Sequence, residues 1–215
     1  MIRVYMISGL GADKRLYRNI RIDNADITYV DWIEPDKKDT LADYAQKLID
    51  TYHIAPGSVV IGTSLGGLLT VEIAKKITLK KAILISSIKT IREAPAYFTF
   101  LRWFPVYKLM PNKLIVKMGE LAKPIFGKMD QVEAYLFNSM LENSSPWFLN
   151  WAMGAVLKWK NKVIPPNIYH IAGDSDYIFD HKKIKDAVIV KGGTHIMVFD
   201  RAKEINQLIA KALNS

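Results

Sequence analysis

The 215-residue sequence contains no cysteine. This absence excludes disulfide bonds, a thiolate nucleophile and metal sites with cysteine ligands. No run of apolar residues approaches the length of about 18 residues that a transmembrane helix needs. The apolar run between Met1 and Gly9 is also too short for a secretory signal. We therefore expect a cytoplasmic protein without a transmembrane segment.

Long runs of basic residues are also missing, although 30 lysines and arginines outnumber 21 acidic residues and give a net charge of +9. Without such a run, nucleic-acid binding is a poor explanation of the charge. No glycine-rich dinucleotide or P-loop pattern is present, and no His, Asp and Glu cluster has metal-ligand spacing. We expect chemistry that needs neither a cofactor nor a metal.

What the sequence does contain is a set of short runs rich in Val, Ile and Tyr. They predict six β-strands, at residues 3–7, 27–32, 58–62, 81–86, 167–172 and 186–190. Apolar residues at helical spacing between Leu41 and Tyr52 predict a helix, which Thr40 and Asp43 can cap. Two more helices are expected at residues 66–76 and 201–213. Strands that alternate with helices predict an α/β fold with a mostly parallel, six-stranded sheet.

The alternation stops between residues 88 and 164, a segment in which no strand is expected. It contains five of the nine prolines, which would divide it into several short helices, and four of the five tryptophans. It also carries 11 basic and 5 acidic residues, so most of the net charge belongs to this segment. We interpret it as a helical insertion in the α/β core.

One motif carries a specific chemical signal. Residues 62–66 read Gly-Thr-Ser-Leu-Gly, which is G-x-S-x-G between a predicted strand and a predicted helix. Such a turn holds the serine in a strained conformation, and a Cβ atom at Gly62 or Gly66 would collide with neighbouring backbone. The motif therefore predicts that Ser64 is a nucleophile at the start of a helix.

With this motif the sequence resembles the α/β-hydrolase superfamily, in its serine-nucleophile branch. The family orders its residues as nucleophile, acid and histidine. The resemblance implies Asp176 as the acid, because it is the fourth residue of Gly173-Asp174-Ser175-Asp176, and Asp174 remains an alternative. It implies His195 as the base, since this histidine follows the last predicted strand. For the other histidines, at positions 53, 170 and 181, packing or solvent exposure is the favoured interpretation.

The resemblance also implies an oxyanion hole formed by the backbone N–H groups of Leu10 and Leu65. Many relatives have His-Gly where this chain has Ser8-Gly9, a departure that can change how the loop is braced. Asp13 follows in the same loop, and its favoured role is to cap the next helix.

At the level of the fold, the resemblance implies an α/β-hydrolase core at residues 1–87 and 165–215. Residues 88–164 would be a helical cap between the sixth and seventh strands of the family. The two N-terminal antiparallel strands of the family would be missing, which leaves an all-parallel sheet.

The function implied is that of a serine hydrolase, similar to carboxylesterases, that cleaves a small ester or thioester through an acyl-enzyme. Aromatic residues in segments 97–104 and 147–151 would line an apolar acyl pocket, or alternatively form the core of the cap itself. The same residues also serve amide or C–C bond hydrolysis and some lyase reactions in this family. A non-catalytic ligand-binding protein of the same fold is a further alternative, and the basic cap could attract an anionic substrate or contact a membrane surface peripherally.

Overall fold

Six strands form one sheet in the order β2-β1-β3-β4-β5-β6, and all pairings between them are parallel. The computed structural model describes residues 1–104, 123–127 and 129–214. The strands are β1 (Ile2–Ile7), β2 (Ala25–Val30), β3 (Val59–Thr63), β4 (Lys81–Ile85), β5 (Ile168–Gly173) and β6 (Ala187–Val190). The prediction of six strands and a parallel sheet is confirmed, and the strand ends differ from the predicted ones by no more than two residues.

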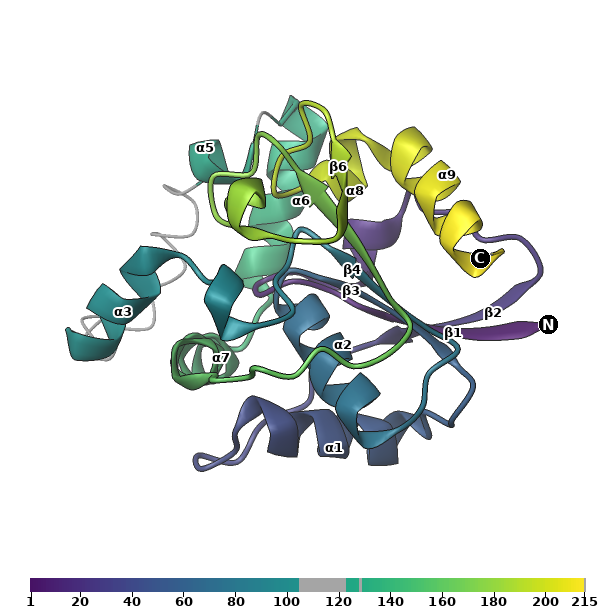
Figure 1. Ribbon diagram of the computed structural model, residues 1–215. Coiled ribbons are helices and arrows are strands. Elements are labelled where there is room, and N and C mark those ends of the chain that lie inside the picture. The colour runs from purple at the N-terminus through teal and green to yellow at the C-terminus, as the bar shows by residue number, and fades with distance from the viewer. Residues whose placement is uncertain (105–122, 128, 215) are drawn as a thin grey trace.

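Helices cover both faces of this sheet (Figure 1). One face is covered by α1 (Leu41–Tyr52), α2 (Leu65–Lys76) and α7 (Pro146–Lys158), and the other by the short helix η1 (Lys14–Tyr17), α8 (Met197–Asp200) and α9 (Ala202–Leu213). Successive strand residues contribute to opposite sides, as in β3, where Val60 joins the core on the α1 side while Val59 and Ile61 join the other. Because both faces are buried, β3 is apolar at nearly every position.

The capping predicted for α1 is confirmed. The Thr40 hydroxyl accepts a hydrogen bond from the Asp43 amide at 3.2 Å, and the Asp43 carboxylate accepts one from the Thr40 amide at 2.9 Å. The helix ends at His53, which adopts a left-handed conformation with φ 51°. These signals fix both ends of α1 beside the sheet.

The segment between β4 and β5 is helical where the structure describes it. It contains the short helix η2 (Ile91–Glu93) and the helices α3 (Ala96–Trp103), α5 (Lys123–Phe126), α6 (Gln131–Glu142) and α7. Prolines stand at two of the helix starts: Pro95 precedes α3, and Pro146 is the first residue of α7. The division of the chain into a core and a cap at residues 88 and 164 stays a prediction, and part of that segment, residues 105–122 and 128, lies outside the described residues.

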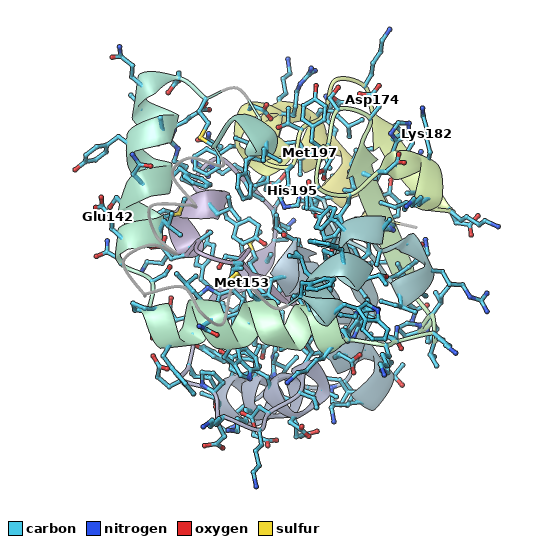
Figure 2. All side chains as sticks on the ribbon, turned by 90° about the vertical axis from the view of Figure 1, so that its left-hand side faces the viewer. Glu142, Met153, Asp174, Lys182, His195 and Met197 are labelled. Atoms are coloured by element: carbon cyan, nitrogen blue, oxygen red, sulfur yellow. The ribbon has the colours of Figure 1, made fainter. Side chains whose placement is uncertain are left out.

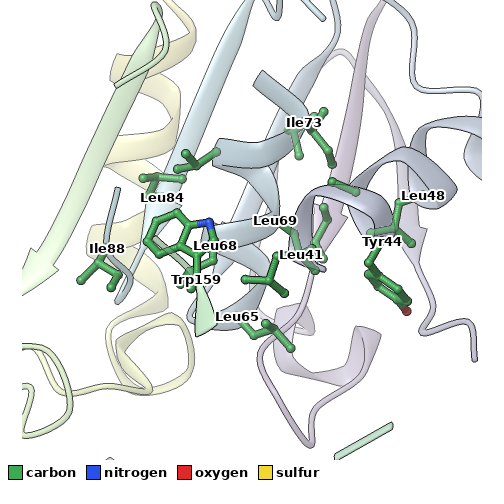
Figure 3. Close-up of a cluster of buried hydrophobic side chains, with 14 of the residues drawn as sticks. Leu41, Tyr44, Leu48, Leu65, Leu68, Leu69, Ile73, Leu84, Ile88 and Trp159 are labelled. Carbon is green, nitrogen blue, oxygen red and sulfur yellow. The ribbon is translucent and has the colours of Figure 1, made fainter. Parts of the chain in front are cut away.

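The C-terminal part of this segment packs into the main core. Figure 3 shows Trp159, which follows α7, in one cluster with Leu68 of α2 and Leu84 of β4. The Trp159 indole N–H donates a hydrogen bond of 2.7 Å to the carboxylate of Glu72, which is itself buried in α2. Helix α7 is therefore held firmly against the α/β layer beneath it.

In the part of the chain that the structure describes, no helix is long and apolar enough to cross a lipid bilayer.

Candidate active site

Ser64 lies at the carboxyl end of β3, in the tight turn that leads directly into α2. Its backbone has φ 55° and ψ −116°, a conformation that side-chain-bearing residues rarely adopt. A Cβ atom at Gly62 would lie 2.1 Å from the Gly66 carbonyl oxygen, and one at Gly66 would lie 2.1 Å from the Ile7 carbonyl oxygen. The steric reason predicted for both glycines is confirmed.

A chain of two hydrogen bonds joins Ser64 to His195 and Asp176. Nε2 of His195 lies 2.9 Å from the Ser64 hydroxyl oxygen, and Nδ1 lies 2.9 Å from Oδ2 of Asp176. A carboxylate can only accept, so the proton sits on Nδ1 and Nε2 is free to accept the hydroxyl proton. Both His195 and Asp176 are buried, which shields the pair from water.

The two candidate acids differ in what they contact. The second carboxylate oxygen of Asp176 accepts hydrogen bonds from the amides of Ile178 and Phe179, at 2.8 and 3.0 Å, which fixes its orientation toward His195. Asp174 instead accepts a 2.6 Å bond from the Gly192 amide, and this bond helps to hold the pKa of its carboxyl below the usual range. In Figure 2, Asp174 lies at the periphery while His195 lies further inward.

The remaining histidines lie away from Ser64. His170 is buried in β5, where burial and the charge of Lys89 lower its pKa to about 3. Its Nε2 lies 2.9 Å from the Ser87 carbonyl oxygen, a packing role within the core. His53 is exposed at the end of α1, and His181 begins the short helix η4 (His181–Lys183).

The loop after β1 lies directly against Ser64. A Cβ atom at Gly9 would lie 3.4 Å from the Ser64 Cβ, so the amide of the next residue, Leu10, belongs to backbone that borders the nucleophile. The Leu65 amide is the first of α2 and has no partner within its helix. The assignment of these two amides as oxyanion donors stays a prediction.

Side-chain hydrogen bonds from Ser8 and Trp32 brace this loop. The Ser8 hydroxyl donates a 2.8 Å hydrogen bond to the Ala12 carbonyl, which also accepts one of 2.8 Å from the Trp32 indole. The loop then closes on Asp13, whose carboxylate caps η1 by accepting from the Arg15 amide at 2.9 Å. The capping role predicted for Asp13 is confirmed.

Two aromatic rings flank His195, and sequence reasoning missed both. The ring centroids of Phe126 and Phe179 lie 5.6 and 5.5 Å from that of the imidazole. Phe126 also contacts Phe137 of α6 at 5.3 Å. No local pattern distinguishes these phenylalanines from others in the chain, because they meet His195 only through the tertiary fold.

An apolar cluster borders the loop after β1. Leu141 of α6 and Leu149 of α7 form a small core with the half-buried side chains of Leu10, Phe137 and Met153. Figure 2 shows Met153 and His195 on the same side of the molecule. The apolar surface beside the loop after β1 thus comes from α6 and α7.

The buried aromatic residues of the segments singled out from the sequence have a different position. Phe148 and Trp151 are buried against Trp32 and Tyr44, with ring centroids 4.7 Å apart for Phe148 and Trp32 and 4.6 Å apart for Trp151 and Tyr44. The ring centroids of Phe98 and Phe179 lie 6.4 Å apart, so Phe179 lies between Phe98 and His195. These rings join α7 and α3 to the core, which is the alternative considered from the sequence.

Hydrogen bonds from Ser87 and Tyr17 stabilise the turn at Ser64. The Ser87 hydroxyl donates a 2.7 Å hydrogen bond to the Ser64 carbonyl. The Tyr17 hydroxyl lies 2.6 Å from the Ile7 carbonyl and 3.0 Å from the Thr63 hydroxyl, where it ties the ends of β1 and β3 together. Burial raises the pKa of this phenol, so it remains a neutral donor.

Among the described residues, no group of three His, Cys, Asp or Glu side chains is placed to hold a metal ion.

Comparison with solved structures finds folds similar to that of this chain. An esterase from Exiguobacterium antarcticum has a TM-score of 0.76 at 13% identity, with 100% of this chain and 92% of that chain covered. A thermophilic esterase from Thermogutta terrifontis has a TM-score of 0.72 at 13% identity, with coverages of 100% and 90%. MenH from S. aureus has a TM-score of 0.72 at 18% identity, with coverages of 99% and 93%. At these identities the likeness concerns the fold.

The sequence itself matches a family model, while no significant match is found among curated proteins. The model describes the alpha/beta hydrolase family and matches residues 6–208, which is most of the chain. The strand order and the turn at Ser64 agree with this match, and the protein therefore belongs to the alpha/beta hydrolase family.

Proposed function

We propose that the protein is a serine hydrolase that cleaves a small ester or thioester through an acyl-enzyme on Ser64. The observation that supports this most directly is the pair of 2.9 Å contacts from His195 to Ser64 and to Asp176. A serine hydroxyl is a weak nucleophile at neutral pH and needs a base that removes its proton during attack. Nε2 of His195 is in hydrogen-bond reach of that proton.

In the acylation step, the Ser64 oxygen forms a bond to the carbonyl carbon while its proton moves to Nε2 of His195. Asp176 stabilises the resulting imidazolium. The negative oxygen of the tetrahedral intermediate accepts hydrogen bonds from the Leu10 and Leu65 amides. The bond to the alcohol or thiol then breaks, and Nε2 returns the proton to that leaving group. Water repeats the sequence on the acyl-enzyme and releases the acid.

The acyl portion of the substrate is proposed to be apolar. Its pocket would be formed by the apolar cluster beside the loop after β1, with Leu10, Phe137 and Met153 as the partly exposed members. A bulkier side chain at Met153 should shorten the preferred acyl chain. The kcat/KM of Met153→Trp and of the wild type on nitrophenyl esters from acetate to octanoate would measure this, and a flat profile in the wild type would contradict the apolar pocket.

A fluorophosphonate probe tests the nucleophile. The wild type should be labelled covalently and should hydrolyse nitrophenyl acetate, and Ser64→Ala should lose both. Ser175→Ala is the matched control, because the Ser175 hydroxyl contacts Asp174 and not His195. An unlabelled wild type would argue for a non-catalytic ligand-binding protein.

A further inference from the structure

A cavity of about 1070 Å³ lies between the start of α1 and one side of α7. This volume lies just above the range of roughly 300–1,000 Å³ that is usual for small-molecule sites. Trp147, Trp151 and Lys158 line it from α7, whereas Leu149 and Met153 of the same helix belong to the cluster near Ser64. Helix α7 therefore separates this cavity from the candidate active site.

The cavity carries an excess of positive charge. It is lined by six lysines and two carboxylates, namely Lys37, Lys38, Lys75, Lys158, Lys160, Lys162, Asp39 and Glu72. Both carboxylates are already paired: Glu72 with Lys75 at 2.8 Å, and Asp39 with Lys47 at 2.7 Å. For the other five lysines, no ion pair is found within the described ranges. Their charges repel one another, and a bound anion would relieve that repulsion.

Three indole rings contribute to the apolar part of the wall, beside aliphatic residues such as Leu41 and Val163. Each indole N–H is already used inside the protein: Trp147 donates to the Pro35 carbonyl, Trp151 to the Asp39 carbonyl and Trp159 to the Glu72 carboxylate. The rings therefore offer only their carbon surface to a ligand. Trp147 is 46% exposed, while Trp151 and Trp159 are buried, so Trp147 is the ring that a ligand can cover.

We infer that this cavity binds a soluble organic polyphosphate with a flat aromatic group, of the nucleoside diphosphate class. Lysine ammonium groups bind phosphate as point charges, and an exposed indole stacks on a base. A lipid headgroup shares the phosphate but has no flat group to cover Trp147. The inference does not rest on the proposed function, because the cavity contains none of Ser64, Asp176 and His195.

Titration calorimetry with ADP tests the lysines. Lys158→Glu/Lys160→Glu should weaken ADP binding by at least about tenfold, because two of the unpaired charges are reversed. The matched control is Lys203→Glu/Lys211→Glu on α9, which changes the net charge equally at exposed positions outside the cavity. Its Kd should stay within about twofold of the wild type. Equal weakening in both variants, or no ADP binding by the wild type, would overturn the inference.

Inorganic pyrophosphate tests the aromatic part. Trp147→Ala should weaken the binding of ADP by about tenfold and leave that of pyrophosphate unchanged, because only ADP carries a ring that can stack. A variant that loses affinity for both ligands to the same extent, or for neither, would overturn the assignment of an aromatic ligand.

Two further measurements distinguish the source of the phosphate and the location of the site. Sedimentation with phosphatidylglycerol vesicles should show no binding that depends on Lys158 and Lys160. If the protein binds these vesicles through both lysines but does not bind ADP, the ligand of the cavity is a lipid surface and not a soluble polyphosphate. Ser64→Ala should bind ADP as the wild type does. A loss of ADP binding in Ser64→Ala would place the ligand at the candidate active site and overturn the separate cavity.

Discussion

The hydroxyl of Ser87 donates a 2.7 Å hydrogen bond to the backbone carbonyl of Ser64. Ser87 follows β4, and its own backbone carbonyl oxygen lies 2.9 Å from Nε2 of the buried His170. The strained turn is therefore tied to the adjacent strand by a side chain that touches no reacting atom.

Removal of this hydroxyl should have a modest effect on stability. The Ser64 carbonyl also accepts hydrogen bonds from the Gly67 and Leu68 amides, so Ser87→Ala does not leave it unpaired. We expect a loss of about 1 kcal/mol in the free energy of unfolding, measured by urea denaturation. A loss of more than about 3 kcal/mol would mean that this single bond maintains the turn.

Substitution of Gly66 should be far more costly. The added Cβ of Gly66→Ala would lie 2.1 Å from the Ile7 carbonyl oxygen, so either β1 or α2 has to move. We expect a loss of more than about 3 kcal/mol in urea denaturation, or a protein that does not fold. Gly57→Ala is the control, because it has open space around it and only a positive φ of 80°, with an expected loss of about 1–2 kcal/mol. Similar losses in both variants would contradict the steric explanation.

His170 should make the protein less stable in mild acid. Its pKa is about 3 in the folded state, through burial first and the nearby charge of Lys89 second, against about 6.5 in the unfolded chain. As the pH falls below 6.5, the unfolded state binds a proton that the folded state does not, so stability decreases until the pH approaches 3. Between pH 6.5 and 5 this amounts to about 2 kcal/mol.

Urea denaturation across this pH range measures the effect. His170→Gln should lower stability at pH 7 but flatten its decrease toward pH 5. An unchanged slope in His170→Gln would show that other groups cause the decrease.

The two aspartates after β5 should differ strongly in activity. Asp176→Asn keeps the shape of the side chain but favours the wrong imidazole tautomer, and we expect kcat/KM on nitrophenyl acetate to fall by about 10⁴-fold. Asp174→Asn should stay within about tenfold of the wild type, because Asp174 contacts the Gly192 amide rather than His195. If Asp174→Asn proves to be the more damaging variant, the proposed acid is the wrong one.

Local patterns determined the framework of the protein. The six strands, the helix after Thr40 and the turn between Gly62 and Gly66 follow from hydrophobic spacing, capping and steric exclusion, which act over a few residues. Because parallel strands end at one edge of the sheet, the loops that contain Ser64, Asp176 and His195 meet there.

Only the tertiary structure decided what surrounds these residues. Three features depend on how distant segments pack: the contact of Phe126 with His195, the hydrogen bond from Ser87 to Ser64, and the different surroundings of the two sides of α7. No spacing in the sequence predicts them. The same holds for Phe148 and Trp151. Their composition predicted either a pocket lining or a core, and the choice was made by the position of Trp32 and Tyr44 on the layer beneath. Burial against a neighbouring element decides between these two outcomes, and that neighbour is a property of the fold.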